Sequence, residues 1–316
     1  MRKPKLVLLR SELGAGTRGA SLGVDALKIA AIDLESSYFR KYDSIDIEDE
    51  NWMLLEKVHH KYAKRIRGLV KIYERLSTAI AKNLKKTNTF PIILAGDHST
   101  AGGTIAGIKM AFPDARVGVI WIDAHADIHS PYTTPSGNLH GMPLATALAE
   151  DNLEVQTNEL DEKTEELWEK LKNIGGITPK ITYDDLIYIG VRDTEAQEDY
   201  LLERHGVRNI TTRELRQIGV EEVVEIVNDR LKDCSKIYIS FDVDSLDPKI
   251  SVGTGTPVPQ GLRIKEAREL LQSLCRDERV CCLEFVEINP TLDTENAMAE
   301  TAFKLLEAAT DAALEA

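Results

Sequence analysis

Long apolar runs are missing from this 316-residue sequence, and basic residues are outnumbered by acidic ones. The run LVLL that follows the basic start RKPK is far too short for a signal-peptide core or a membrane span, so we interpret it as a strand. The 52 acidic residues against 39 basic ones give a formal net charge of -13, which repels nucleic acid and anionic lipid surfaces. The sequence therefore predicts a cytoplasmic protein with no membrane and no nucleic-acid partner.

Cysteine is scarce and lacks metal-ligand spacing. The four cysteines lie in the last third of the chain, at Cys234, Cys275, Cys281 and Cys282. We interpret them as reduced core thiols rather than as disulfides or a reactive thiol. The glycine-rich stretch GAGTRGASLG lacks the GxxxxGK[ST] spacing of a phosphate-binding loop, and no GxGxxG opens a helix there. We therefore interpret this stretch as an ordinary loop.

The length suits one large α/β domain or two small ones, and 43% hydrophobic residues suffice for a sizeable core. Short apolar runs rich in β-branched residues alternate with segments of helical spacing, which is typical of a mostly parallel sheet with helices on its faces. We predict a single domain over residues 1–316 with a three-layer αβα architecture. The expected strands are 5–9, 90–94, 117–122, 186–191, 236–241 and 280–286, and the clearest helices are 62–84, 214–231, 264–274 and 294–314.

Two local features add to this outline. Thr211, followed three residues later by Glu214, has the form of a capping box and predicts a helix start near there. The charged stretch 150–180 contains Gly175 and Gly176 and has weak helical periodicity around 160–171. A segment of about thirty residues cannot bury a core alone, so we predict a surface insertion rather than a separate domain.

Polar clusters follow three of the expected strands: GDHS after PIILA, DAHADIH after VGVIWI, and DVD after KIYISF. Ligands of open α/β sheets bind outside the carboxyl ends of the strands, so side chains from these clusters are expected to converge. Alternate residues of an extended chain point to the same face. On that basis we expect Asp123, His125 and Asp127 to face one side, and Asp242 and Asp244 to add two more groups.

Each of these residues has an ordinary structural explanation when it is taken alone. A single Asp after a strand is usually a turn or a helix N-cap, and a single His is usually a satisfied core residue. Together the two alternating sets favour a metal site, because buried carboxylates repel one another unless a cation neutralises them. The oxygen and imidazole donors favour Mn, Mg, Zn, Fe or Co over a thiolate site.

The number of donors indicates more than one ion. Four Asp and two His, at His98 and His125, exceed what a single ion needs. Two ions about 3.5–4 Å apart that share bridging carboxylates fit this set. A water between two such ions is acidified to hydroxide near neutral pH, which is a nucleophile for hydrolysis.

The polar motifs resemble those of the ureohydrolase family. GDHS, DAHAD, SGNLHGMP, SFDVDSLDP, GTGTP and EINP occur in the family's order between Gly96 and Pro290. DAHxD together with SFDxDxxDP is highly specific for ureohydrolases, and SGNLHG resembles arginases more than agmatinases or formimidoylglutamases. The resemblance implies an arginase-like fold and a hydrolase that cleaves the guanidino group of L-arginine to give L-ornithine and urea.

The resemblance also implies two Mn2+ ions per subunit, with other divalent metals as alternatives. One ion would be held by His98, Asp123, Asp127 and Asp242, and the other by Asp123, His125, Asp242 and Asp244. Asp123 and Asp242 would bridge the two ions. The spacing of the residues predicts the same cluster, whereas manganese and the bridging pattern come from the resemblance alone.

Three further residues match functional positions of the family. His140 in SGNLHG matches a proton-shuttle histidine, which is needed because the departing amine must be protonated. Glu287 in EINP matches a carboxylate that holds the substrate guanidinium through paired charge-assisted hydrogen bonds. Thr256 in GTGTP matches a position that lines the substrate pocket. The ordinary alternatives are a local hydrogen bond for His140 and a salt bridge at the sheet edge for Glu287.

Two positions depart from the arginase pattern. His129 stands where arginases commonly have Asn, beside Ser136 and Asn138, although an imidazole can still donate a hydrogen bond to the substrate α-carboxylate. In IGVRDTEAQE, Asp193 matches the first family Asp, but Glu195 replaces the second, which contacts the α-amino group. Arginine is the leading substrate hypothesis. The alternative is another ureohydrolase, namely an agmatinase, guanidinobutyrase or formimidoylglutamase.

Two hypotheses from other classes are weaker. A metal-binding or assembly protein without catalysis is disfavoured, because every family metal ligand, His140 and Glu287 are present. A metal-dependent deacetylase of similar fold is disfavoured by the ligand count and by SGNLHG. The resemblance implies a small-molecule guanidino substrate and a homo-oligomer, a trimer or a hexamer.

Overall fold

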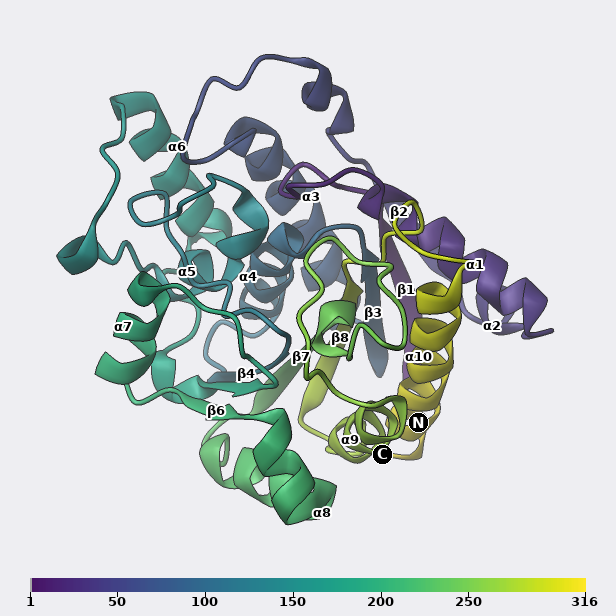
Figure 1. Cartoon of the computed structure of the whole chain (residues 1–316). Helices are drawn as coiled ribbons and strands as arrows, with labels where there is room; N and C mark the ends of the chain where they lie inside the picture. Colours follow the sequence, from purple (N-terminus) through teal and green to yellow (C-terminus); the bar gives the residue numbers. More distant parts are fainter. Residues whose placement is uncertain (1) are drawn as a thin grey trace.

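A single eight-stranded sheet forms the centre of the protein, as seen in the computed structural model, which describes residues 2–316 (Figure 1). The strand order is β2-β1-β3-β8-β7-β4-β5-β6, and every neighbouring pair is parallel. The strands are β1 (Lys3–Leu9), β2 (Ser44–Ile47), β3 (Thr89–Ala95), β4 (Val117–Ile122), β5 (Leu186–Ile189), β6 (Arg208–Ile210), β7 (Lys236–Asp242) and β8 (Val280–Val286). The predicted parallel sheet is confirmed, and the prediction lacked only the edge strands β2 and β6.

The α-helices of the described chain are α1 (Gly23–Asp33), α2 (Tyr38–Lys41), α3 (Ile66–Leu84), α4 (Ala101–Ala111), α5 (Pro143–Leu148), α6 (Glu162–Lys172), α7 (Ala196–Arg204), α8 (Thr212–Arg230), α9 (Ile264–Cys275) and α10 (Ala297–Glu315). Helices α3 and α10 begin later than predicted, because Arg65 and Asn296 have left-handed φ angles of 61° and 59° just before them. The helix start near Thr211 is confirmed, since the Thr211 side chain accepts a hydrogen bond from the Glu214 N–H.

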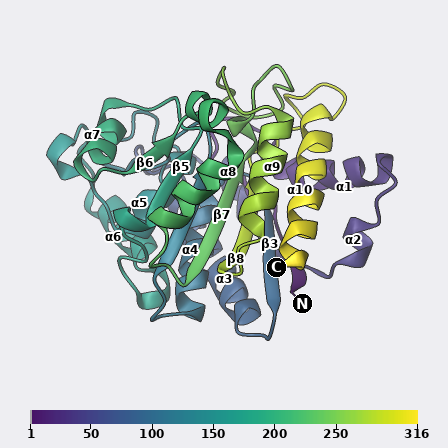
Figure 2. The same ribbon diagram turned by 90° about the horizontal axis from the view of Figure 1, so that it is seen from below.

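Alternate residues of the strands face two hydrophobic cores. In β1, Leu6 and Leu8 pack in the core beneath α1, α8, α9 and α10, whereas Val7 and Leu9 pack in the core beneath α3, α4, α5 and α6. Figure 2 shows α8, α9 and α10 lying across one face of the sheet. The three-layer αβα architecture and the single domain are therefore confirmed.

Helix α4 follows directly from the turn that carries His98 and is held close to α3. It is buried along most of its length, and its glycines allow the close approach. A Cβ atom at Gly107 would lie 2.6 Å from the Ile80 Cβ of α3, so any larger residue there would push the two helices apart. This packing fixes the start of α4, and with it the position of His98.

The stretch 150–180 contains α6, which is attached to the main core. Trp168 and Leu171 are fully buried in the core shared with α3 and α4, while the charged residues of α6 face outward except for Lys172, which is buried. The four cysteines are buried, and none of them is in a disulfide. Within residues 2–316 no helix combines the length and the apolar character needed to cross a membrane.

Candidate metal centre

A cavity of about 290 Å³ is lined by residues that follow the carboxyl ends of β3, β4, β7 and β8. All the site residues predicted from the sequence line this cavity except Asp123, which is fully buried among them. The lining residues from that set are His98, His125, Asp127, His129, Ser136, Asn138, His140, Asp193, Glu195, Asp242, Asp244, Thr256 and Glu287. The parallel sheet thus brings together side chains that are up to 189 positions apart, as in the His98–Glu287 contact.

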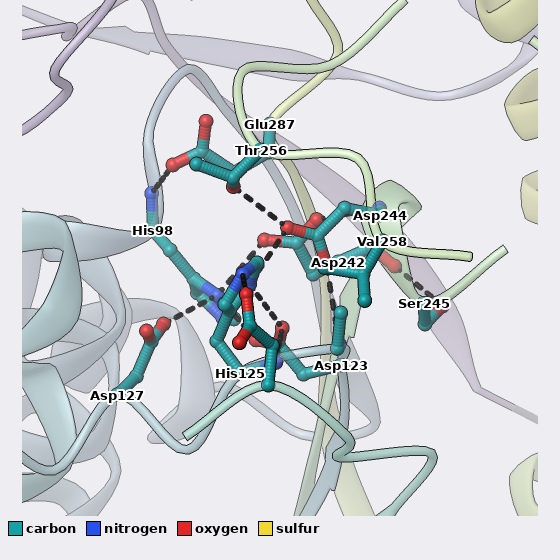
Figure 3. Close-up of polar contacts among 12 residues, drawn as sticks. His98, Asp123, His125, Asp127, Asp242, Asp244, Ser245, Thr256, Val258 and Glu287 are labelled. Atoms are coloured by element: carbon teal, nitrogen blue, oxygen red, sulfur yellow. Dashed lines mark hydrogen bonds and ion pairs between the residues drawn. The ribbon is translucent and has the colours of Figure 1, made fainter. Parts of the chain in front are cut away.

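The first group of metal-ligand type is centred on His98. Its Nδ1 lies 3.0 Å from Asp123 Oδ2 and 3.1 Å from Oδ2 of both Asp127 and Asp242 (Figure 3). The other ring nitrogen, Nε2, lies 2.7 Å from the Ser240 hydroxyl, and the ring stacks on Trp121 with 4.1 Å between centroids. These contacts fix the imidazole so that Nδ1 faces the three carboxylates.

The second group shares Asp123 with the first. His125 Nδ1 lies 3.0 Å from Asp244 Oδ2 and 3.6 Å from Asp123 Oδ1. The Thr256 hydroxyl donates a hydrogen bond of 3.1 Å to Asp244 Oδ2 and holds that carboxylate in place (Figure 3). The two groups meet at Asp123, which is one of the two carboxylates that the family resemblance implies as bridging.

The local backbone differs from the prediction of an extended, alternating chain. Asp123 Oδ1 accepts a hydrogen bond from the His125 N–H at 2.7 Å, and Asp242 Oδ1 accepts one from the Asp244 N–H at 2.7 Å. Asp127 has a left-handed φ of 50°, and Val243–Ser245 form a 3-10 turn. The carboxylates converge because Asp side chains bend the backbone into turns, and the extended alternation was wrong.

The donor atoms of the first group fit a bound cation. His98 Nδ1 and Asp123 Oδ2 are buried and face each other, yet neither has a hydrogen-bond partner. A buried polar atom without a partner is costly, and an ion between these two atoms would satisfy both. A set of donors made of carboxylate oxygens and an imidazole nitrogen suits Mn2+, Zn2+ or a related divalent ion.

The carboxylates in this cluster are electrostatically crowded. Burial, and next the charge of Asp123, raise the pKa of Asp127 to about 6. Burial and the charges of Asp244 and Asp123 raise the pKa of Asp242 well above its usual range. Without a cation these two carboxyls take up protons more readily than usual, and a divalent ion bound between them would compete with those protons and relieve the repulsion.

His140 and Glu287 face each other on the cavity wall. His140 Nδ1 lies 3.2 Å from Glu287 Oε1, which also accepts a hydrogen bond of 2.9 Å from the His98 N–H. Burial lowers the pKa of His140, but the hydrogen bond with Glu287 and the charges of Glu287, Asp127 and Asp97 together outweigh it and raise the pKa to about 9. Burial opposes ionisation of Glu287, and the same hydrogen bond lowers its pKa. The pair is therefore an imidazolium and a carboxylate at neutral pH.

The outer part of the cavity contains the residues that depart from the family pattern. His129 Nε2 lies 3.1 Å from Glu195 Oε2, and its Nδ1 lies 3.0 Å from the Thr133 hydroxyl. Glu195 is the N-cap of α7 and forms a capping box with Glu198. Asp193 is two-thirds exposed at the cavity rim, where its carboxylate lies 3.7 Å from His125 Nε2.

Ser136 and Asn138 lie on the opposite loop of the cavity. The Ser136 hydroxyl accepts a hydrogen bond from the Asn138 N–H, and the Asn138 side-chain oxygen accepts one from Lys64 Nζ at 3.1 Å. Lys64 thus brings a positive charge next to Asn138.

The sequence analysis missed two buried residues that organise the site. Glu198 is 3% exposed, and it accepts hydrogen bonds from the N–H groups of Ile128 and Glu195. The spacing of Glu195 and Glu198 in TEAQE has the form of a capping box and was the available signal. Ser240, which contacts His98, begins the motif SFDVDSLDP, but the motif gave it no role, because a single Ser inside an apolar strand is unremarkable without the fold.

Comparison with known proteins extends these observations to nearly the whole chain. A model of the Arginase family matches residues 7–310. The arginase of Brevibacillus brevis is 34% identical over 302 residues, which cover 93% of each chain, and that of Bacillus caldovelox is 33% identical over 310 residues, or 97% of each. The crystal structure of the arginase from Bacillus subtilis strain 168 covers 98% of both chains with a TM-score of 0.83 at 31% identity. The chain therefore belongs to the arginase family and is a hydrolase of the arginase-type ureohydrolase class.

Proposed function

We propose that this protein is an arginase that converts L-arginine and water to L-ornithine and urea at a site for two Mn2+ ions. The observation that carries the proposal is the pair of metal-ligand groups that meet at Asp123. His140 and Glu287 face the same cavity. When bound by these residues, two divalent ions would supply a hydroxide nucleophile near neutral pH.

Glu287 is suited to hold the substrate guanidinium. Its side chain is 4% exposed and ionised, and the His98 N–H fixes one of its oxygens. A carboxylate held in this way can accept paired hydrogen bonds from a planar guanidinium. The proposed role is to orient the guanidino carbon toward the metal-ligand cluster.

His140 is suited to protonate the departing amine. The imidazole is protonated at neutral pH because Glu287 holds the positive charge. Once water has added to the guanidino carbon, the C–N bond to the ornithine nitrogen breaks, and that nitrogen must take up a proton. His140 supplies this proton, and its backbone is held by the hydrogen bond from the His140 N–H to the Gly14 carbonyl.

The outer residues are proposed to bind the amino-acid end of the substrate. Ser136, Asn138 and His129 would contact the α-carboxylate, and Asp193 and Glu195 the α-amino group. The second candidate, another ureohydrolase, is favoured by one observation: His129 and Glu195 already bond each other, which leaves fewer free donors for an α-carboxylate.

The assembly and the location are part of the proposal. From the resemblance of the sequence to the family, we infer that the protein is cytoplasmic and forms a homo-oligomer, either a trimer or a hexamer. Size-exclusion chromatography with light scattering tests the oligomeric state, and a monomeric mass would contradict it.

The stretch 150–180 is proposed to be a surface insertion of the single domain, on the grounds of its outward-facing charges.

The experiment that tests the function is urea release by the apoprotein reconstituted with manganese. Urea from L-arginine, agmatine and guanidinobutyrate, and formamide from formimidoylglutamate, which has no guanidino group, are measured in parallel with and without the metal. Manganese-dependent urea from L-arginine alone is the expected result. Activity only on another of these substrates would keep the metal chemistry and overturn the substrate, and no activity on any of them would overturn the enzymatic proposal.

A further inference from the structure

A third group of metal-ligand type lies in the outer cavity, apart from the two groups that share Asp123. It consists of His129, Glu195 and Glu198, whose donor atoms lie within 4.8 Å of one another. His129 Nε2 is 3.1 Å from Glu195 Oε2 and 3.7 Å from Glu198 Oε2. None of these residues belongs to the two-ion ligand set implied by the family resemblance.

The third group repeats the construction of the inner ones. In the first group one imidazole nitrogen of His98 faces carboxylates while the other bonds the Ser240 hydroxyl. In the third group Nε2 of His129 faces carboxylates while Nδ1 bonds the Thr133 hydroxyl at 3.0 Å. A metal-ligating histidine is usually oriented in this way, by a hydrogen bond from its second ring nitrogen.

The hydroxyl of Thr133 is itself fixed, which fixes the imidazole. It accepts a hydrogen bond of 3.1 Å from the Ser130 N–H, and the His129 side chain is 7% exposed. When Nδ1–H donates to this oxygen, Nε2 presents a lone pair to the two glutamates. A lone pair that faces carboxylate oxygens needs either a proton or a cation between them.

The distances suit a small divalent ion. Ligands placed about 2.0–2.2 Å from a tetrahedral zinc ion lie roughly 3.3–3.5 Å from each other. The separations of 3.1 and 3.7 Å from His129 Nε2 fall on either side of that value. Small side-chain adjustments would be needed, and the half-exposed Glu195, which also caps α7, is the member of the group with space to make them.

The charge balance also favours a cation here. Burial, and next the contact with Glu195, raise the pKa of Glu198 well above its usual range. Asp193 adds another carboxylate at the same rim. A divalent ion would neutralise the two glutamates, as the inner ions would neutralise the aspartates.

We propose that His129, Glu195 and Glu198 form a third divalent-metal site, of the zinc type, in the outer cavity. Three protein ligands leave coordination positions open toward the cavity, where water or a substrate group can bind. The departures from the family pattern at His129 and Glu195 then have one common explanation, since Asn at the first position would remove the imidazole ligand. With an ion bound, His129 and Glu195 would meet the amino-acid end of the substrate through the ion rather than directly, whichever guanidino substrate the enzyme uses.

The test is the zinc content of the metal-free protein after dialysis against buffered Zn2+, measured by mass spectrometry. We expect wild type to retain one more zinc ion per chain than either His129→Asn or Glu195→Gln. The matched controls are His59→Asn and Glu203→Gln, two exposed positions outside the group, which should retain the wild-type content. Circular dichroism establishes that all variants are folded.

The comparison separates this proposal from the proposed function. The zinc content of the His129→Asn variant reports the inner sites alone. If the two-ion centre does not form, the zinc content of every protein falls by the same amount. The difference between wild type and the two variants reports the third site. Equal zinc content in wild type, His129→Asn and Glu195→Gln would overturn the proposal, whatever the inner sites hold.

Discussion

The inner and outer parts of the cavity differ in how they are built. The inner metal ligands lie on turns directly after the buried strands β3, β4 and β7, and most are almost fully buried. The outer residues lie on loops and at the start of α7, and Asp193 and Glu195 are more than half exposed. Every departure from the family pattern that we identify lies in the outer part. Side chains at strand ends hold the reacting groups in place. Side chains on loops can be exchanged, which alters how the rest of the substrate is recognised.

The largest expected effect comes from the carboxylate that both inner groups share. Asp123→Asn removes a charge from both metal positions, and we expect kcat to fall by more than about 10⁴-fold with loss of bound metal. Metal analysis and urea release measure the two effects. Asp311→Asn, an exposed position on α10, is the control and should keep full metal content. Full activity in Asp123→Asn would contradict the two-metal centre.

The second prediction concerns the proton donor. His140→Asn removes the imidazolium while it leaves the metal ligands intact, so kcat should fall by about 10²–10⁴-fold with unchanged metal content. Partial recovery in added imidazole would support proton transfer as the lost step. If kcat were unchanged, the role of His140 would be the local hydrogen bond with Glu287 alone.

A smaller effect is expected from the hydroxyl behind His98. Ser240→Ala removes the 2.7 Å contact to His98 Nε2, which orients the ring. Loss of such a partner typically weakens metal binding by about 10–100-fold. Competition with a chelator measures the affinity, and exposed Ser235→Ala on the same face of the chain is the control. Equal affinities in the two variants would show that Trp121 stacking alone holds the ring.

The sequence predicted the inner region better than the outer one for a physical reason. Apolar strands with polar residues at their ends form a strong signal, and β3, β4 and β7 were found with the ligands that follow them. The hydrogen bond between His129 and the Glu195 carboxylate and the burial of Glu198 depend on how the loop after β5 meets the loop after β4. Such contacts between loops have no periodic signature.

Elements that lack an amphipathic pattern were also missed. Helix α4, AGGTIAGIKMA, is buried on most sides and contains three glycines that serve its packing on α3, so neither periodicity nor propensity indicated it. Strand β2 is a four-residue edge strand with alternating polar residues, and β6 has only three residues. Edge strands of this kind are defined by their neighbours in the sheet rather than by their own sequence.

The fourth prediction uses pH to probe the boundary between the two regions. The folded-state pKa of His140, about 9, exceeds its ordinary value, so its ion pair with Glu287 stabilises the fold fully below about pH 6.5 and is lost as pH rises through 9. The free energy of unfolding of wild type should therefore exceed that of Glu287→Gln by more at pH 6.5 than at pH 9.5, and this excess should shrink by about 1–2 kcal/mol between the two pH values. Chemical denaturation at equal metal content measures this difference. A pH-independent difference would show that the pair does not carry the charge.

The smallest effect is expected in the outer part of the cavity, and measuring it tests whether the inner and outer parts act separately. Glu195→Ala removes a carboxylate proposed to contact the substrate α-amino group, so KM for L-arginine should rise about 10-fold while kcat changes by less than about threefold. Glu195→Asp keeps the charge and the capping role and should change KM less. Steady-state kinetics on L-arginine and guanidinobutyrate distinguish the outcomes, because guanidinobutyrate has no amino group for Glu195 to contact and its KM should not respond. If kcat fell together with kcat/KM for both substrates, the outer carboxylate would act on the reacting centre, and the separation of the two regions would be wrong.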